Sequence, residues 1–541
     1  MRNRLRIILN HLFTVFSGAS VAVLVLVLVV VLGPMLSKGV TAVFFRSTVE
    51  FERLQFEMNN RGDKQQIENS LAEYHEHTGR IYEIYDEFCL GLNVSRQVSQ
   101  VRSIARDYTR QLRYVDTPDE EYDRLKDLSR DIRDQFSEAL ESQDSEFALK
   151  EIDKILNMPQ RSEFKGTEFE KVFKMAKTYR DVAAAMDLDK RDVYSEDLAA
   201  IGDLLSKLFG PRPSADKPPL AMNQYGATRW DRVKKLSDEL LWKTQWQQQG
   251  EGMPLKEVRL SRAQMYSETP MKSFFDILEN DLEKIFRPRM KIYWQYLIDD
   301  STPGYFFGGI GPEIIGTLVL TLLAMLFAIP PGIISAVYLV EYAGDTRTVR
   351  LIRICINTLA GVPSIVFGLF GMAFFVLFLL PMFKSNASAC ILTASLTLSV
   401  MILPIIIRAS EEAIRSVPVS YKQAALALGA GELRTVLTVT LPAAMPGILT
   451  GIILSLSRAA GETAPILFTG AVALGPIAKS LFDPTRTLSY GSYNIAVSDR
   501  ISMLVPHNQY GMVSALIILV LVLNLAAIII RSRISKRLHA S

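Results

Sequence analysis

Six long apolar stretches constrain the fold of this chain more than any other feature of its sequence. Each is long enough to cross a hydrocarbon core of roughly 30 Å, which takes about 20 residues of α-helix. Hydrophobic residues make up 49% of the chain and charged residues 22%, and the two kinds are segregated along the sequence. We therefore predict an all-α membrane protein with six transmembrane helices. The predicted spans are residues 12–36, 314–340, 357–382, 388–407, 445–474 and 511–530.

Basic residues flank these spans on one side and predict the topology. With six spans and a cytoplasmic N-terminus, four clusters of Arg and Lys all lie inside, as the positive-inside rule requires. The first apolar run exceeds the roughly 7–15 residues of a signal-peptide core, so we predict that it is retained as a helix. Both termini are therefore expected in the cytoplasm. The clusters are Arg2, Arg4 and Arg6; Arg347, Arg350 and Arg353; Arg408, Arg415, Lys422 and Arg434; and Arg531, Arg533, Lys536 and Arg537.

A long segment without a membrane-length apolar run, residues 46–292, separates the first span from the second. Apolar and charged residues alternate there at helical spacing, as in the apolar stripe from Tyr122 to Phe136, which predicts a mostly α-helical domain. The topology places this domain outside the cytoplasm, where it would dock a partner or sense a signal. The chain is thus expected to comprise a first transmembrane helix (1–45), a helical extracytoplasmic insert (46–292) and a membrane core with five spans (293–541).

The sequence predicts neither catalysis nor a metal site. His75 and His77 are two residues apart, so on a helix they point in different directions and make a poor metal pair. The chain has no Gly-x-x-x-x-Gly-Lys-Ser/Thr loop, the pattern that cradles nucleotide phosphates. We therefore expect no catalytic residue, no metal ligand, no cofactor in this chain and no nucleic-acid partner. Any ATPase that drives the protein would be a separate chain that binds the ATP.

The loop over residues 408–446 carries the most local information. Pro418 is expected to end one helix, because proline disfavours helical conformation in the residue before it. Ser420 would then cap a short new helix, with Gln423 completing a capping box. Gly429 would close that helix in the left-handed conformation. Capping alone explains these residues if the loop is only a well-capped cytoplasmic hairpin.

A sequence pattern favours a more specific interpretation of the same loop. A further helix over about 432–440 is expected to end by Pro442. The loop reads Gln423-Ala424-Ala425-x-x-x-Gly429 and, further on, Val439-x-Leu441-Pro442. It resembles the EAA loop of ABC importer permeases, although that family usually has Glu at the position of Gln423. The resemblance implies that the short helix docks in a groove of an ATPase subunit and transmits its closure. The residues to which it assigns coupling are Ser420, Gln423, Ala424, Ala425, Gly429, Leu441 and Pro442.

Four motifs in the membrane core extend the resemblance: Gly316–Leu323, Tyr338–Tyr342, Gly361–Phe370 and Ala460–Thr469. In this order they look like the PstA-type permease subunit of the phosphate ABC importer. The match covers residues 1–45 and 293–541, whereas the insert has no counterpart, because the family usually has a short loop there. The resemblance implies the fold of ABC importer permeases and a location in the bacterial inner membrane.

The resemblance also implies a function and a set of partners. The chain would be the permease subunit of an ATP-driven importer of inorganic phosphate. Its partners would be a second homologous permease subunit, two ATPase subunits, an extracytoplasmic phosphate-binding protein and membrane lipid. One alternative is a permease for another oxyanion, such as molybdate or sulfate. The other is a membrane sensor that uses the helical external domain.

Two charged residues, Arg458 and Glu462, lie inside the fifth predicted span. They are one helical turn apart and lie on one face of the helix. Counted from the inner end of the span with a helical rise of 1.5 Å per residue, Arg458 lies around the middle of the bilayer. A central Arg costs roughly 2.5–3.5 kcal/mol on insertion scales, so such residues face protein or water and tend to be functional. We predict that Arg458, modulated by Glu462, lines the path of a phosphate anion, whose geometry a guanidinium matches. Thr463 and Ser457 would add hydroxyl donors. The alternative is an ion pair that only braces helices.

Arg408 lies at the inner end of the fourth predicted span. It serves either as an ordinary positive-inside anchor or as a second charge at the cytoplasmic exit of the path. The resemblance favours the exit role, because the family pattern has an Arg at this point.

Overall fold

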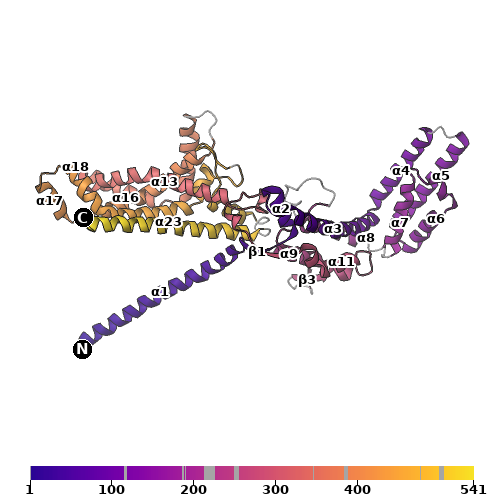
Figure 1. The fold of residues 1–541 in the computed structure, drawn as a ribbon, viewed down its shortest axis with the longest axis horizontal. Coiled ribbons are helices and arrows are strands. Elements are labelled where there is room, and N and C mark those ends of the chain that lie inside the picture. Colours follow the sequence, from indigo (N-terminus) through magenta and orange to yellow (C-terminus); the bar gives the residue numbers. More distant parts are fainter. Residues whose placement is uncertain are drawn as a thin grey trace. The chain divides into compact units, whose positions relative to one another are not determined.

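The chain divides into two compact units in the computed structural model. The first unit contains Met1–Phe44 and Ile292–Ser541, and the second contains Phe45–Lys291. Both are built mainly from helices, which Figure 1 shows coloured along the sequence. The structure describes residues 2–114, 118–184, 188, 191–212, 226–248, 255–344, 346–382, 388–475, 477–498 and 505–540.

Among the described residues, 6 helices are long and apolar enough to cross a membrane, which confirms the predicted number of spans. All of them belong to the first unit. Their length and composition support a multi-pass membrane protein. The spans are Leu12–Val40, Gly311–Tyr342, Ser364–Met382, Ile391–Arg415, Glu432–Gly461 and Pro506–Lys536.

Several span bounds differ from the predicted ones, among them those of the third and fifth spans. The third span begins at Ser364 instead of residue 357, because Pro363 separates it from the preceding helix, which ends at Ala360. The predicted fifth span, 445–474, was wrong at both ends. Its helix runs from Glu432 to Gly461 and is followed by a break and a short helix.

The long helices of the first unit pack against one another in pairs (Figure 1). The long helix α16 packs against α13 and α19, and α19 packs against α23. The helix α1 contacts α23 near the C-terminal end of α1, where Met35 accepts a hydrogen bond from Ser514. The elements are α1 (Arg2–Val40), α13 (Gly311–Val337), η6 (Tyr338–Tyr342), α14 (Arg347–Ala360), α15 (Ser364–Gly371), η7 (Met372–Leu379), η8 (Leu380–Met382), α16 (Ile391–Arg415), α17 (Val419–Ala427), α18 (Glu432–Thr435), η9 (Val436–Thr440), α19 (Leu441–Gly461), α20 (Ala464–Thr469), α21 (Leu488–Val497) and α23 (Pro506–Ala540), with η4 (Trp294–Leu297) and η5 (Pro303–Tyr305) before α13.

The second unit is mostly helical, as predicted for the insert, and also contains a β-hairpin that the sequence pattern did not indicate. In that hairpin β2 pairs antiparallel with β3, and Trp242 lies opposite Ser261. Strands β1 and β4 pair with each other where the chain enters and leaves this unit. The elements are β1 (Phe44–Ser47), α2 (Val49–Asn59), α3 (Lys64–Leu92), α4 (Val94–Tyr114), α5 (Asp119–Glu141), α6 (Ser145–Leu156), η1 (Pro159–Phe164), α7 (Glu170–Ala184), α8 (Arg191–Phe209), α9 (Trp230–Leu241), β2 (Trp242–Gln248), β3 (Leu255–Ser261), α10 (Arg262–Met265), α11 (Lys272–Asn280), α12 (Leu282–Phe286) and β4 (Arg289–Ile292).

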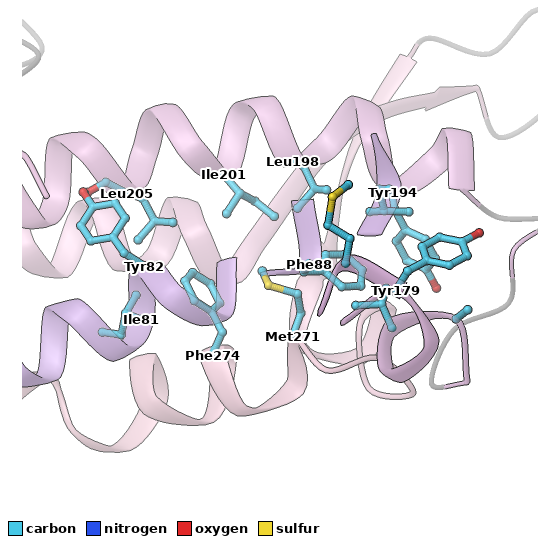
Figure 2. Close-up of a cluster of buried hydrophobic side chains, with 14 of the residues drawn as sticks. Ile81, Tyr82, Phe88, Tyr179, Tyr194, Leu198, Ile201, Leu205, Met271 and Phe274 are labelled. Atoms are coloured by element: carbon cyan, nitrogen blue, oxygen red, sulfur yellow. The ribbon is translucent and has the colours of Figure 1, made fainter. Parts of the chain in front are cut away.

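The second unit has its own hydrophobic core, part of which Figure 2 shows. The side chains come from α3, α7, α8 and α11 and from the residues that precede α11. Phe88 is fully buried, and its ring lies 5.9 Å from that of Tyr266. Nearby, the buried Asp197 accepts hydrogen bonds from the Arg262 guanidinium at 2.7 and 3.0 Å. Because the insert has a hydrophobic core of its own, it forms a separate compact unit.

Candidate functional site

The loop between the fourth and fifth spans contains the short helix α17 (Val419–Ala427), which begins two residues earlier than predicted. Pro418 occupies the N-cap position, and no side chain caps the helix. The predicted capping box of Ser420 and Gln423 is therefore wrong, since both residues lie inside the helix. Proline explains the difference, because its fixed φ, here −58°, already sets the chain for the first turn.

The end of α17 agrees with the sequence pattern. Gly429 has φ of +81°, a conformation that side chains other than glycine rarely adopt. Its N–H donates to the carbonyl of Leu426 at 2.9 Å and so closes the last turn. Ala424 and Ala425 lie in the second half of the helix.

No helix ends at Pro442, contrary to the prediction. The π-helical segment η9 joins α18 directly to α19, and Leu441 and Pro442 lie in the first turn of α19. A proline ring clashes with the carbonyl four residues before it, here that of Thr438. The wider π turn includes Thr438 and gives that carbonyl room, so the helix continues through the proline.

The helix α17 buries none of its residues in this chain. Its apolar side chains Val419, Tyr421 and Leu426 are exposed, and Leu428 directly after it is 89% exposed. Exposed apolar side chains grouped on one element are typical of a surface that meets another protein or a membrane.

An ion pair ties α17 to the second span. The ammonium group of Lys422 contacts the carboxylate of Glu341 in η6, and both side chains are mostly shielded from solvent. Close by in sequence, the carboxylate of Glu411 in α16 binds Arg353 of α14 at 2.8 Å and Arg415 at 2.6 Å. Sequence analysis missed both acidic partners. Their signal was the placement of Glu residues directly beside the ends of apolar spans.

The second part of the site is the break that follows α19. Arg458 lies in the last turn of α19, and its Nε lies 3.3 Å from Oε1 of Glu462. Glu462 has already left the helical conformation, with ψ of 130°, and Thr463 precedes the short helix α20. The predicted pair therefore forms, although it spans a helix end and not one continuous helical face. Both side chains keep partial access to solvent, at 36% for Arg458 and 20% for Glu462.

The packing against α16 locates the break. Gly447 of α19 lies against Ala413 near one end of α16, and Gly470 after α20 lies against Cys390 at the other end. Arg458 is about midway between these two glycines, so the charge pair lies level with the middle of the fourth span. Irregular backbone at membrane depth is tolerated only where protein buries it or where it lines a water-filled cavity.

The hydroxyl groups near the break do not all face the charge pair. Ser457 donates to the side-chain carbonyl of Asn524 in α23 at 2.8 Å. This hydroxyl therefore links two helices, instead of serving the anion path as predicted. The carbonyl of Glu462 accepts a hydrogen bond from Ser489 of α21 at 3.3 Å. Sequence analysis missed Asn524, whose signal was a polar residue inside the last apolar span.

Arg408 lies within α16, because this helix continues to Arg415 beyond the predicted span end. Its side chain is 59% exposed, and Nε lies 3.5 Å from Oε1 of Glu412. Within the described part of the chain its ion-pair partner is Glu412, whereas Arg458 pairs with Glu462, so the structure does not join the two predicted charges into one site.

Comparisons with known proteins match the membrane core of this chain. The family described as binding-protein-dependent transport system inner membrane component matches residues 328–540. The probable ABC transporter permease protein YqgI of Bacillus subtilis is 33% identical over 266 residues, which cover 46% of this chain and 87% of YqgI. The phosphate transport system permease protein PstA of Xylella fastidiosa (strain Temecula1) is 32% identical over 227 residues, which cover 42% of this chain and 77% of that protein.

Other relatives match over a shorter region. PstA 1 of Mycobacterium tuberculosis is 40% identical over 175 residues, so the chain spans about half of its length, 55%. An inward-facing structure of the MetNI methionine ABC transporter has a TM-score of 0.34 and 19% identity, covering 42% of this chain and 95% of that one. Identity above 30% across most of the length of YqgI and of the Xylella protein shows common ancestry. This chain belongs to the binding-protein-dependent transport system inner membrane components.

Proposed function

We propose that this chain is the permease subunit of an ATP-driven importer of inorganic phosphate in the bacterial inner membrane. The phosphate assignment rests on its similarity to PstA proteins over the membrane core. The observation that carries the mechanism is the Arg458–Glu462 pair at a helix break, level with the middle of the fourth span. Intramembrane charge beside discontinuous helices is a recurring feature of substrate sites in transporters.

In this mechanism Arg458 supplies the charge that compensates the anion. A guanidinium binds phosphate oxygens through two parallel N–H donors, and such charge-assisted bonds are strong in a site with little water. Glu462 holds part of the guanidinium when the site is empty and thereby limits how tightly the anion is retained. Thr463, at the start of α20, offers a hydroxyl beside the same break. Arg408 would act as a second charge on the cytoplasmic side.

The energy comes from separate ATPase subunits. We propose that they cover the exposed apolar side chains of α17, as the EAA-loop resemblance implies, with Leu441 and Pro442 continuing the motif into α19. The Lys422–Glu341 ion pair then carries a movement of α17 to the second span, so that nucleotide-driven closure reaches the membrane helices. A second permease subunit and an extracytoplasmic phosphate-binding protein complete the importer, and both termini lie in the cytoplasm.

Radiolabelled phosphate uptake in cells carrying the intact system tests this function. Arg458→Ala removes a charge-assisted contact of roughly 1.5–3 kcal/mol, so uptake is expected to fall at least tenfold. Arg458→Lys keeps the charge and is expected to retain part of the activity. Arg347→Ala makes the same change at an exposed position outside the spans and should leave uptake unchanged. Excess unlabelled phosphate should abolish the signal, whereas excess sulfate or molybdate should not.

Thermal unfolding of the purified variants separates an anion site from a helix brace. If the pair only braces helices, Glu462→Gln and Arg458→Ala should lower the melting temperature alike and reduce uptake in proportion. If Arg458 instead lines the path of the anion, the Arg458→Ala variant should lose transport while its melting temperature stays close to that of wild type. Wild-type uptake by Arg458→Ala would refute the assignment.

A further inference from the structure

Basic side chains line a groove between α4 and α5 in the second unit, which we call the basic groove. Its volume is about 320 Å³. The short polar side chains of Thr109 and Ser129 also line it, and Ala105 is its only apolar lining residue among those described. The basic residues of the groove are Arg106, Arg110, Arg113, Lys126, Arg130 and Arg133.

Helical spacing explains why the charges converge. On α4 the basic residues follow one another at four and then three positions, and the three on α5 have the same spacing. Residues with this spacing share one face of a helix. Because α4 packs against α5, the two basic faces meet across the groove. The acidic residues Asp123, Asp127 and Asp131 of α5 are exposed and do not line the groove.

Carboxylates within the unit neutralise only part of this charge. Asp107 lies 3.7 Å from Arg110, and Asp134 lies 2.7 Å from Arg133. The Nε of Arg113 donates to the Tyr122 hydroxyl at 3.0 Å, which removes no charge. Over the described part of the chain, Arg106, Lys126 and Arg130 have no carboxylate within ion-pair distance. Like charges held this close repel one another unless an anion lies between them.

The groove also affects the titration of its acidic neighbour. The pKa of Asp134 is lowered chiefly by the hydrogen bond from Arg133; burial opposes this, and the charges of Arg133, Arg102 and Arg130 lower the pKa further. A carboxylate at the edge of the groove therefore experiences a positive potential from both helices.

We propose that the basic groove binds a phosphoryl oxyanion. Guanidinium groups match the tetrahedral oxygens of a phosphoryl group in paired contacts, and arginines supply five of the six cations. The lining offers no apolar wall for a nucleobase or an acyl chain, so recognition is confined to the anionic group. This site is separate from the Arg458 pair and does not depend on the proposed transport function.

Isothermal titration of the full chain with inorganic phosphate and with tripolyphosphate tests the site. Every sample carries Arg458→Ala, so that the membrane path does not contribute to the signal. The triple variant Arg106→Gln, Lys126→Gln and Arg130→Gln is expected to bind tripolyphosphate at least tenfold more weakly. The matched control, Lys150→Gln, Lys174→Gln and Lys177→Gln, removes the same charge from exposed positions of the second unit and should bind as before.

A second arm distinguishes a free anion from a lipid headgroup. The full chain in nanodiscs is mixed with vesicles of phosphatidylglycerol or of phosphatidylcholine, and flotation measures capture. Binding of tripolyphosphate that the groove variant weakens supports a soluble phosphoryl ligand. Groove-dependent capture of phosphatidylglycerol vesicles alone supports a lipid headgroup. Absence of both signals, or equal loss in the groove variant and its control, overturns the proposal and leaves an acidic protein as the counterpart of this face.

Discussion

Glu50 in α2 is 1% exposed, and its carboxylate lies 3.0 Å from the guanidinium of Arg53. Burial raises the pKa of Glu50 to about 7, and the charge of Arg53 opposes only part of that effect. The folded second unit therefore binds a proton at pH values where the unfolded chain, with an ordinary glutamate pKa near 4.5, has released it. By linkage, the free energy of unfolding declines as pH rises from about 4.5 to about 7 and is level above that range.

Replacement of this residue should remove the pH dependence. Glu50→Gln is expected to raise the free energy of unfolding at pH 8 by roughly 1–3 kcal/mol and to leave it nearly unchanged at pH 4.5. Tryptophan fluorescence during thermal unfolding measures this, since Trp230, Trp242 and Trp246 all lie in the second unit. Glu83→Gln, an exposed change, should have no effect at either pH. Equal melting temperatures for Glu50→Gln and wild type at pH 8 would contradict the assignment.

At the scale of single residues, the sequence shows which charged residues are important better than it shows which residues they contact. A charge inside an apolar run stands out, so Arg458 and Glu462 could be identified from spacing alone. Their contact was anticipated, but the helix end between them was not. The partners Asn524 and Glu341 lie far away in the sequence from Ser457 and Lys422. Only the packing of distant helices brings such pairs together, and one sequence carries no information about that distance.

At the scale of elements, long apolar helices were predictable and their interruptions were less so. Hydropathy predicts a span because a helix needs a run of about 20 apolar residues to cross the hydrocarbon core of a membrane. Proline acts differently from one context to another. It separates two helices at Pro363, begins one at Pro418 and is accommodated by a π turn at Pro442. Local sequence does not decide between these outcomes, because neighbouring helices determine which carbonyl groups have room to move.

The exposed apolar surface of α17 leads to a prediction about assembly. Leu428→Asp places a charge where we expect the ATPase to bury an apolar side chain, so co-purification of the ATPase with the permease should be lost. The permease itself should remain folded, because Leu428 is 89% exposed in the isolated chain. Met58→Asp, a comparable change at an exposed apolar residue of the second unit, should leave co-purification intact. Retained ATPase binding and transport by Leu428→Asp would exclude docking at this helix.

At the scale of the whole molecule, each of the two units has its own core, and the chain passes between them through the paired strands β1 and β4. The hydroxyl of Ser47 lies 3.3 Å from the carbonyl of Arg289, so a short linker can join these two residues. We predict that replacing residues 48–288 with a Gly-Ser linker yields a folded membrane unit that still imports phosphate. Size-exclusion chromatography and uptake assays check this. Adding Arg458→Ala to the deletion should abolish the remaining uptake, and an unfolded or inactive deletion variant would show that the insert is essential.

The break between α19 and α20 has a mechanical consequence for the fifth span. A continuous helix turns as a rigid rod, so a twist applied at one end would reach the other end undiminished. Here the helical conformation is interrupted at Glu462, where ψ is 130°, and rotation about its backbone dihedrals absorbs such a twist. In the proposed mechanism α19 can therefore swing while α20 stays in place against α15 and α16.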